Sequence, residues 1–243
     1  MSQSTNLDTP ASVLAVGAHP DDIEFQCGAT LAKWISRGST VHYLVLTDGS
    51  KGTWDPQADT NDLIAIRQVE QRNAALTLGV NGEIVFLGQT DGELQSTLEL
   101  RQQVALWIRR LTPSVVLGHD PWRRYRLHPD HRHAGWLTVD AVVAARDPHF
   151  YPDDEIPHHR PDALLLFEAE EPDHVEDVTG FAEMKIAALL DHRSQLRSTM
   201  FIDPNDDGTQ LAAFRTRMLG KLTSHGRLAR VAEGEAFHLI DRL

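Results

Sequence analysis

Short apolar runs alternate along this chain with longer segments in which apolar residues recur every three or four positions. Each short run predicts a buried strand: residues 13–16, 41–46, 84–87, 114–117, 163–167 and 237–240. Each longer segment predicts a helix: residues 23–37, 61–78, 97–111, 130–145, 179–196 and 208–223. This alternation favours an α/β fold, a Rossmann-like and mostly parallel sheet with helices on both faces.

No internal repeat, low-complexity tract or shift in composition divides the chain. We therefore expect a single domain over residues 1–243, with its core at about residues 11–200 and C-terminal helices and a final strand in residues 201–243. A mass of 27.2 kDa lets a folded chain bury about 70% of its extended surface, which is enough for one large core. The Pro-, Asp- and His-rich residues 147–161 predict a long loop.

Charge and cysteine content narrow the functional classes. Lys and Arg number 23 against 35 Asp and Glu, and the resulting net charge of −12 disfavours nucleic acid and anionic membranes as partners. The apolar fraction of 41% excludes a disordered chain. Cys27 is the single cysteine, so no internal disulfide can form. Residues Met1 to Pro10 show no secretory signal, and we expect a cytoplasmic protein.

The predicted topology itself indicates where a ligand should bind. In parallel α/β sheets, ligands lie beyond the carboxyl ends of the strands, here in the loops at about residues 18–22, 48–56 and 119–131. Histidine and aspartate gather in two of these loops. One cluster follows the first strand and includes His19, and the other begins at His119 and continues to residues 128–133.

These clusters predict a metal site. Asp21 or Asp22 could instead cap the following helix, and His131 could be a cap or a surface side chain. Capping leaves His19 unexplained, however, and both clusters lie at strand ends. His19 and Asp22 can point at one ion and His131 can complete the set, as in hydrolytic zinc sites with an open fourth position. Asp21 then remains free to take a proton from the metal-bound water.

Two motifs resemble those of a known family. Residues 18–24, Ala-His-Pro-Asp-Asp-Ile-Glu, with Gly-Ala-Thr at residues 28–30, resemble the AHPDDxE signature of the PIG-L/LmbE deacetylases. Residues 128–135, His-Pro-Asp-His-Arg-His-Ala-Gly, match the second signature of that family, HPDHxxxG. The resemblance covers about residues 11–200 and includes weaker similarity near residues 67–92 and 185–195.

The resemblance implies a divalent-metal hydrolase, usually a zinc enzyme, although another metal such as Fe²⁺ would also fit. Such an enzyme removes an acyl group, normally acetyl, from an N-acylated amino sugar conjugate such as an N-acetylglucosaminide. Matched by position, the metal ligands would be His19, Asp22 and His131, with Asp21 as general base. The small-molecule amino sugar would be the partner, and the sequence leaves the oligomeric state open, a homo-oligomer included.

The resemblance also implies roles for nearby residues. His128 would stabilise the tetrahedral intermediate or protonate the leaving amine, and Asp130 would hold His128 by a hydrogen bond. Arg67 matches an arginine that contacts the sugar. Some members carry a tyrosine two residues before the first histidine of the second motif, whereas this chain has Arg126 there and Tyr125 one residue earlier.

The basic and aromatic residues 122–126 have two interpretations. They are either a solvated loop that balances local acidity or a subsite that binds anionic or sugar groups through guanidinium contacts and aromatic stacking. Tyr125 and Arg126 are therefore candidate substrate-binding residues. His174 and His192 are further candidates for lining the cleft.

Other function classes remain alternatives. A metal-dependent phosphoesterase also clusters His and Asp at strand ends, but a two-metal site needs more carboxylates than the two motifs supply. A nucleotide-binding module would need a glycine-rich phosphate loop, and neither G-x-G-x-x-G nor G-x-x-x-x-G-K-[ST] follows any predicted strand. A non-catalytic sugar-binding relative would not need every motif position filled, as they are here.

Overall fold

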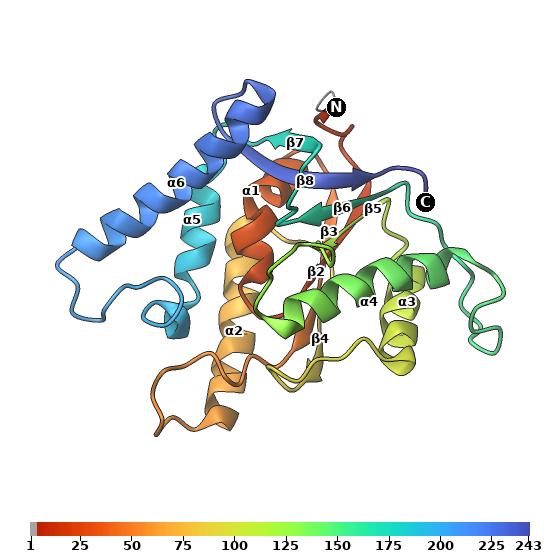
Figure 1. The fold of residues 1–243 in the computed structure, drawn as a ribbon, viewed down its shortest axis with the longest axis horizontal. Coiled ribbons are helices and arrows are strands. Elements are labelled where there is room, and N and C mark those ends of the chain that lie inside the picture. The colour runs from red at the N-terminus through yellow and green to blue at the C-terminus, as the bar shows by residue number, and fades with distance from the viewer. Residues whose placement is uncertain (1–3) are drawn as a thin grey trace.

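A computed structural model describes residues 4–243 and shows one eight-stranded sheet flanked by helices (Figure 1). The strands are β1 (Ser4–Thr5), β2 (Ser12–Gly17), β3 (Thr40–Thr47), β4 (Ile84–Gln89), β5 (Val115–His119), β6 (Ala163–Phe167), β7 (His174–Asp177) and β8 (Gly234–Ile240). The helices are α1 (Asp22–Ser36), α2 (Thr60–Leu78), α3 (Leu98–Leu111), α4 (Pro129–Arg146), α5 (Ala182–Leu190) and α6 (Thr209–Ala229), with a short 3₁₀ helix η1 (Arg193–Gln195).

The strand order is β1-β7-β8-β6-β5-β2-β3-β4, which confirms the α/β prediction. All neighbours are parallel except β8, which runs antiparallel to both β6 and β7. Strands β1 and β7 were not predicted, because they are short and polar and the apolar pattern does not extend over them. Part of the Met1–Pro10 segment, residues 1–3, lies outside the described residues. Within residues 4–243, no helix has the length and apolar character needed to cross a bilayer.

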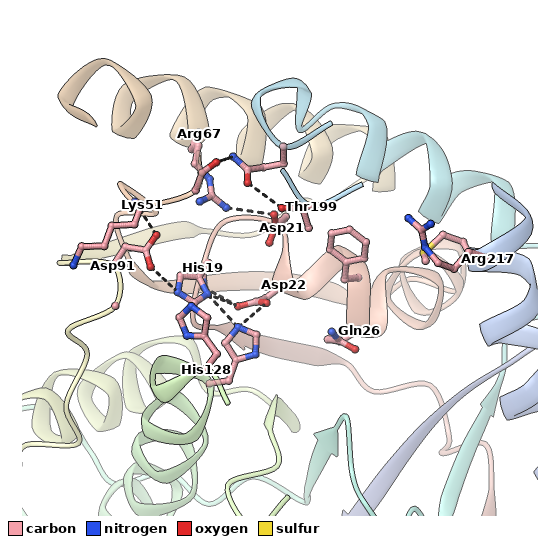
Figure 2. Close-up of a pocket in the computed structure, with 16 residues that line it drawn as sticks. His19, Asp21, Asp22, Gln26, Lys51, Arg67, Asp91, His128, Thr199 and Arg217 are labelled. Carbon is pink, nitrogen blue, oxygen red and sulfur yellow. Dashed lines mark hydrogen bonds and ion pairs between the residues drawn. The ribbon is translucent and has the colours of Figure 1, made fainter. Parts of the chain in front are cut away.

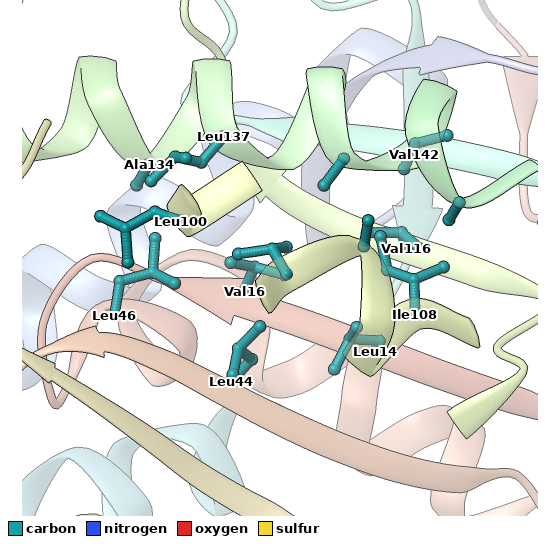
Figure 3. Packing of buried hydrophobic residues seen from close by; sticks show 14 of the residues in the cluster. Leu14, Val16, Leu44, Leu46, Leu100, Ile108, Val116, Ala134, Leu137 and Val142 are labelled. Atoms are coloured by element: carbon teal, nitrogen blue, oxygen red, sulfur yellow. The ribbon is translucent and has the colours of Figure 1, made fainter. Parts of the chain in front are cut away.

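The core lies on both faces of the central strand β2, whose residues alternate between them. Leu14 and Val16 pack with residues of α3 and α4 on one face (Figure 3). Val13 and Ala15 pack on the other face, where α1 contributes a stripe at helical spacing that includes Trp34. Because each fully buried side chain of this kind contributes about 1.5–3 kcal/mol, the two clusters hold β2 firmly in register.

Two helices, α5 and α6, differ in extent from the sequence prediction. The segment predicted as one helix over residues 179–196 forms α5 only between Ala182 and Leu190, preceded by Gly180 in a left-handed conformation and followed by η1. Helix α6 continues to Ala229, six residues beyond its predicted end at residue 223. Its last turns pack through buried Leu222 and Gly226, so tertiary contacts stabilise a polar stretch that has little helical pattern of its own.

The sheet order places a topological switch point between β2 and β5. From β2 the chain proceeds through β3 to β4 on one side, and from β5 to β6 on the other. Neighbouring β2 and β5 are parallel, so their carboxyl ends meet at one edge of the sheet. The two His/Asp loops follow these strands and are thereby brought together, as expected for ligand sites in such sheets.

Candidate metal centre and catalytic cleft

The loop after β2 holds His19 and Asp22 against each other. The Asp22 carboxylate accepts a hydrogen bond from the backbone N–H of His19 at 2.8 Å, and its Oδ2 lies 3.3 Å from His19 Nδ1. Asp21 takes the position preceding α1 with a left-handed φ of 102°, and its side chain makes no capping hydrogen bond. A left-handed conformation is costly for a residue other than glycine and is typical of functional sites. Helix capping therefore does not account for Asp21.

Helix α4 supplies His131 to the same point. His131 Nε2 lies 3.2 Å from His19 Nδ1 and 3.4 Å from Asp22 Oδ1. Gly135, the last residue of the second motif, lets α4 approach the sheet this closely. A Cβ at that position would lie 2.7 Å from the carbonyl oxygen of His119 and 2.8 Å from the nitrogen of Pro121. A glycine at the end of the motif is thus a packing requirement.

The three side chains fit a divalent cation. The two imidazole nitrogens are 3.2 Å apart, and each faces one oxygen of the Asp22 carboxylate, His19 Nδ1 facing Oδ2 at 3.3 Å and His131 Nε2 facing Oδ1 at 3.4 Å. The corners of a tetrahedron with arms of 2.0–2.1 Å, the usual zinc–ligand bond length, are about 3.3–3.4 Å apart. Two nitrogens and a carboxylate oxygen are also the donor set that zinc favours in catalytic sites. The predicted ligands therefore converge as a metal site requires.

The protonation states of two of the three side chains, His131 and Asp22, favour metal binding as well. Burial lowers the pKa of His131 to about 4, so its imidazole is neutral at pH 7 and can donate a lone pair. Although burial alone would raise the pKa of Asp22, His131 and His119 hold it well below the usual value. Asp22 is consequently a carboxylate over the whole physiological pH range.

The second nitrogen of His19 faces two more carboxylates. His19 Nε2 lies 3.0 Å from Asp130 Oδ2 and 3.1 Å from Asp91 Oδ1. Asp130 also accepts hydrogen bonds from the backbone N–H groups of Gly92 and Leu94. This arrangement directs Nδ1 of His19 toward Asp22 and His131, because Nε2–H is engaged by the carboxylates.

The partner of Asp130 differs from the expectation. The sequence predicts that Asp130 holds His128, but its hydrogen bonds go to His19 and to the backbone near residue 93. His128 stays nearby, since possible ligand atoms of His19, Asp91, His128 and Asp130 all lie within 4.8 Å of one another. The aspartate of the second motif thus orients a histidine of the first one.

Asp21 is held separately from the three converging side chains. Its Oδ2 lies 3.3 Å from Nη2 of the buried Arg67, and its backbone N–H donates to Gln71 Oε1 at 2.9 Å. Burial raises the pKa of Asp21 to about 6; Arg67 opposes this shift and the neighbouring Asp22 adds to it. A carboxyl group with a pKa near neutrality can exchange protons at physiological pH.

Arg67 is itself fixed by the loop after β3. Nη1 donates to the carbonyl oxygen of Gly49 at 2.8 Å, and Nη2 donates to that of Pro20 at 2.5 Å. Gly52 faces the guanidinium so closely that a Cβ there would overlap Nη1. The two glycines of this loop, Gly49 and Gly52, therefore make room for Arg67, which in turn positions Asp21.

Replacing Gly52 by alanine is therefore expected to lower kcat/KM by about 10–100-fold, because displacing Arg67 misplaces Asp21. Steady-state kinetics on an N-acylated amino sugar, the substrate class that the motif resemblance implies, together with the thermal midpoint, would measure this. Gly220→Ala is the matched control, since no atom lies within 4 Å of a Cβ at that exposed helical position. Equal kcat/KM for both variants would contradict the positioning role.

The predicted site residues did not include three members of the cluster: Asp91, described above, His119 and Glu168. His119, buried at the end of β5, places Nε2 3.3 Å from Asp22 Oδ2 and Nδ1 3.1 Å from Glu168 Oε2. Glu168 follows β6, lies 2.9 Å from Arg126 Nη2 and faces His131 Nδ1 at 3.5 Å. His119 and Glu168 both stand at the carboxyl end of a parallel strand, so the same topological rule could have identified them.

The remaining predicted residues do not line the catalytic cavity. Tyr125 is 90% exposed, and the guanidinium of Arg126 is paired with Glu168 beside His131. The prediction that His174 lines the cleft is wrong, because it lies in β7 with its Nε2 2.8 Å from Glu176 Oε1. His192 is buried behind the cleft with Nε2 3.3 Å from Glu24.

The proposed metal ligands, together with Asp21, Arg67 and His128, line one cavity of about 440 Å³. In Figure 2, Asp21 and Arg67 lie on one side of the His19–Asp22 pair and His128 lies on the other. The arrangement combines a set of cation ligands, an uncommitted carboxylate and a solvent-exposed imidazole around one opening. The cavity wall consists of His19, Asp21, Asp22, Phe25, Gln26, Lys51, Gly52, Arg67, Asp91, Gly92, His128, His131, Gln195, Thr199, Arg217 and Met218.

Comparisons with known sequences agree with the motif resemblance. The sequence model of the PIG-L family, described as GlcNAc-PI de-N-acetylase, matches residues 14–142. The chain is 38% identical over 186 residues to a diacetylchitobiose deacetylase of Thermococcus kodakarensis, covering 75% of this chain and 69% of that protein. It is 31% identical over 232 residues to a 1D-myo-inositol 2-acetamido-2-deoxy-alpha-D-glucopyranoside deacetylase of Mycolicibacterium vanbaalenii, covering 76% of this chain and 81% of that protein.

The fold is also similar to a solved structure. N,N'-diacetylchitobiose deacetylase from Pyrococcus horikoshii superimposes with a TM-score of 0.84 at 30% sequence identity, covering 96% of this chain and 84% of that chain. The similarity covers 96% of this chain and so extends beyond residues 14–142, the segment matched by the family model.

Proposed function

The chain belongs to the PIG-L family, and from this premise we propose that it removes the acetyl group from N-acetylglucosamine conjugates with the help of a divalent metal ion. The related deacetylases described above act on substrates that contain N-acetylglucosamine. The observation that carries the proposal is the convergence of His19, Asp22 and His131 beside a separate carboxylate, Asp21, in one cavity.

His19 Nδ1, an Asp22 oxygen and His131 Nε2 would hold the metal, which we propose to be zinc, with Fe²⁺ as the alternative. A bound divalent ion supplies Lewis acidity, which lowers the pKa of water and polarises an amide carbonyl. Asp91 and Asp130 support this role from behind, because they engage the other nitrogen of His19. Carboxylates in that position raise the basicity of a ligating imidazole and fix its orientation.

Asp21 would act as the general base. Its carboxylate accepts a proton from the attacking water at Oδ1 or Oδ2, and Arg67 keeps it turned toward the cavity. His128, exposed on the opposite side of the cluster, would stabilise the developing oxyanion or donate a proton to the leaving amine. Arg67 would also contact the sugar, through the cavity wall that it shares with Asp21.

Tyr125 and Arg126 have less support as substrate-binding residues. Arg126 is better assigned to positioning, because its guanidinium bridges Glu168 and the region of His131. Tyr125 would have to turn inward from its 90% exposed position to reach an oxyanion, and its role stays a prediction.

We further propose that the whole chain acts as one domain in the cytoplasm. Strand β8 comes from the C-terminal end of the chain yet pairs with both β6 and β7, so the C-terminal residues complete the sheet that carries the site. The buried single cysteine, Cys27, is consistent with a reducing compartment.

The proposed function is tested by incubating the purified protein with Zn²⁺ or Fe²⁺ and an N-acetylglucosaminide, and measuring acetate release and metal content per chain. An aryl phosphate serves as the competing substrate. Acetate release that requires bound metal would support the proposal. Release of phosphate without release of acetate would replace it by a phosphoesterase function.

Glu168 provides a separate test of the metal site. Glu168→Gln is expected to weaken metal binding by about 10–100-fold, since the carboxylate beside His131 and His119 orients them. Competition with a chromophoric chelator measures this affinity without any turnover. Glu170→Gln, which removes a carboxylate two residues along, is the matched control. Unchanged affinity in Glu168→Gln would contradict the orienting role.

A further inference from the structure

A second cavity, of about 520 Å³, lies beside the catalytic cleft and has no role in the proposed reaction. It is enclosed by α1, α6, and the segments that follow β5 and β6. We call it the Lys221 cavity, after a lysine of its wall. The residues of its wall that matter here are Gln26, Arg123, Arg124, Glu168, Lys221 and His225.

The Lys221 cavity adjoins the metal site. Gln26 lines both cavities, and Glu168, which lines the Lys221 cavity, lies 3.5 Å from His131. Helix α6 also contributes residues to both the catalytic cleft and the Lys221 cavity. Arg217 lines the catalytic cleft, while Lys221 and His225 follow at intervals of four residues and line the second cavity. Residues at this spacing share one face of a helix.

The charges on the wall of the Lys221 cavity do not balance. Arg123 lies 3.4 Å from Glu168, which Arg126 also contacts, and Arg124 lies 3.0 Å from Glu170, so both arginines of the wall already have acidic partners. Lys221 Nζ donates to the uncharged Gln26 Oε1 at 2.9 Å. Within residues 4–243, no carboxylate lies within 4.0 Å of this ammonium group, which leaves N–H donors without an acidic partner.

The charged groups around Lys221 do not neutralise its ammonium group. Burial and, to a smaller extent, the nearby Lys185 lower the pKa of Lys221 to about 8, whereas Glu168 and Glu235 act in the opposite direction. Lys221 is thus mostly charged at pH 7. Glu235 is already engaged by Lys185 at 2.5 Å. Burial and Lys221 lower the pKa of His225 to about 4, so His225 adds no charge at pH 7.

We propose that the Lys221 cavity binds a carboxylate group, held by the Lys221 ammonium next to the catalytic cleft. A single uncompensated cation matches a monoanion, and a partly buried ammonium gains more from such a partner than a solvated one does. Gln26 lines both cavities, so a substrate bound in the catalytic cleft can extend into the Lys221 cavity. We therefore assign the carboxylate to the aglycone of the amino sugar, and this assignment rests on the proposed function. A free carboxylate ligand is the other source of the same chemistry.

Two measurements on the full-length, metal-loaded protein test this. The first compares kcat/KM for phenyl and 4-carboxyphenyl N-acetylglucosaminides in the wild type, Lys221→Met, and the control Arg227→Met. Arg227 is exposed on α6 and its replacement removes the same charge outside the cavity. The second titrates benzoate into the same three proteins by calorimetry. Lys221→Gln is a second variant in case the methionine variant does not fold.

The wild type and Arg227→Met are expected to favour the charged glycoside by about tenfold, and Lys221→Met to lose that preference. If benzoate binds the wild type but not Lys221→Met and the glycosides show no preference, the carboxylate comes from a free ligand and the aglycone assignment is overturned. If the phenyl glycoside is deacetylated while neither preference nor benzoate binding depends on Lys221, the cavity proposal fails and the proposed function stands. Benzoate binding that depends on Lys221, without acetate release from either glycoside, supports the site and overturns the proposed function.

Discussion

Asp21→Asn is expected to lower kcat for acetate release by about 10²–10⁴-fold while the metal content stays unchanged. The variant removes the group that accepts a proton from water, and it leaves His19, Asp22 and His131 in place. Because Asp21 has a pKa raised to about 6 by burial, its carboxylate is well suited to this proton transfer at neutral pH, whereas an amide cannot accept the proton.

Asparagine is the appropriate replacement on structural grounds. Asp21 has a φ of 102°, and asparagine is among the few residues that tolerate positive φ. Its side-chain oxygen can still accept from Arg67 Nη2, and the backbone bond to Gln71 does not involve the side chain. We therefore expect the fold and the neighbouring ligands to be retained, so that a loss of turnover reports on the base.

The experiment pairs steady-state kinetics with elemental analysis of the same preparations. Asp62→Asn, an exposed position in the first turn of α2, controls for loss of one carboxylate. Near-normal kcat in Asp21→Asn would show that another group takes the proton. Loss of metal together with activity would instead place Asp21 among the ligands.

His19→Ala is expected to reduce metal affinity by more than about 10–100-fold, because it removes a proposed ligand itself. A loss of about 10–100-fold is typical when only a residue that hydrogen-bonds to a ligand is replaced. The change also leaves the carboxylates of Asp91 and Asp130 without the imidazole that faces them at 3.1 and 3.0 Å. A buried polar group that loses its partner costs about 1–3 kcal/mol. The free energy of unfolding of the metal-free variant should therefore fall as well.

Chelator competition measures the affinity, and denaturant unfolding in the presence of a chelator measures the stability. His133→Ala is the matched control from the second motif, since His133 Nδ1 accepts a hydrogen bond from Ser96 and takes no part in the cluster. Wild-type metal affinity in His19→Ala would exclude His19 as a ligand. A similar loss in His133→Ala would indicate a general disruption of the loop.

The apolar pattern predicted the central strands because β2 and β5 are buried on both faces and need no partner to be recognised. It did not predict β1 or β7. Ser4–Thr5 and His174–Asp177 are polar, and they form strands because β7 and β8 offer them backbone hydrogen bonds. The antiparallel insertion of β8 between β6 and β7 likewise has no local signal, since strand direction depends on how the chain returns to the sheet.

In the candidate site, too, some features could be predicted from the sequence and others depend on tertiary contacts. The placement of His19, Asp22 and His131 followed from two motifs and from the rule that parallel strands present ligands at their carboxyl ends. The partner of Asp130 did not follow, because its bond to His19 joins residues 111 positions apart. The roles of His119 and Glu168 depend on side chains that meet only after β5 and β6 pair in register.

The amino-acid sequence by itself determined the α/β architecture, the two loops that carry the chemistry and the side chains able to bind a cation, since each depends on spacing within a few residues. Only the tertiary structure decided which carboxylate supports which histidine, how Arg67 turns Asp21 toward the cleft, and that Lys221 lies 2.9 Å from Gln26, 195 positions away along the chain. The physical reason is that local spacing specifies which side chains share a turn or a strand face, whereas pairing across the molecule is set by helix packing and strand register.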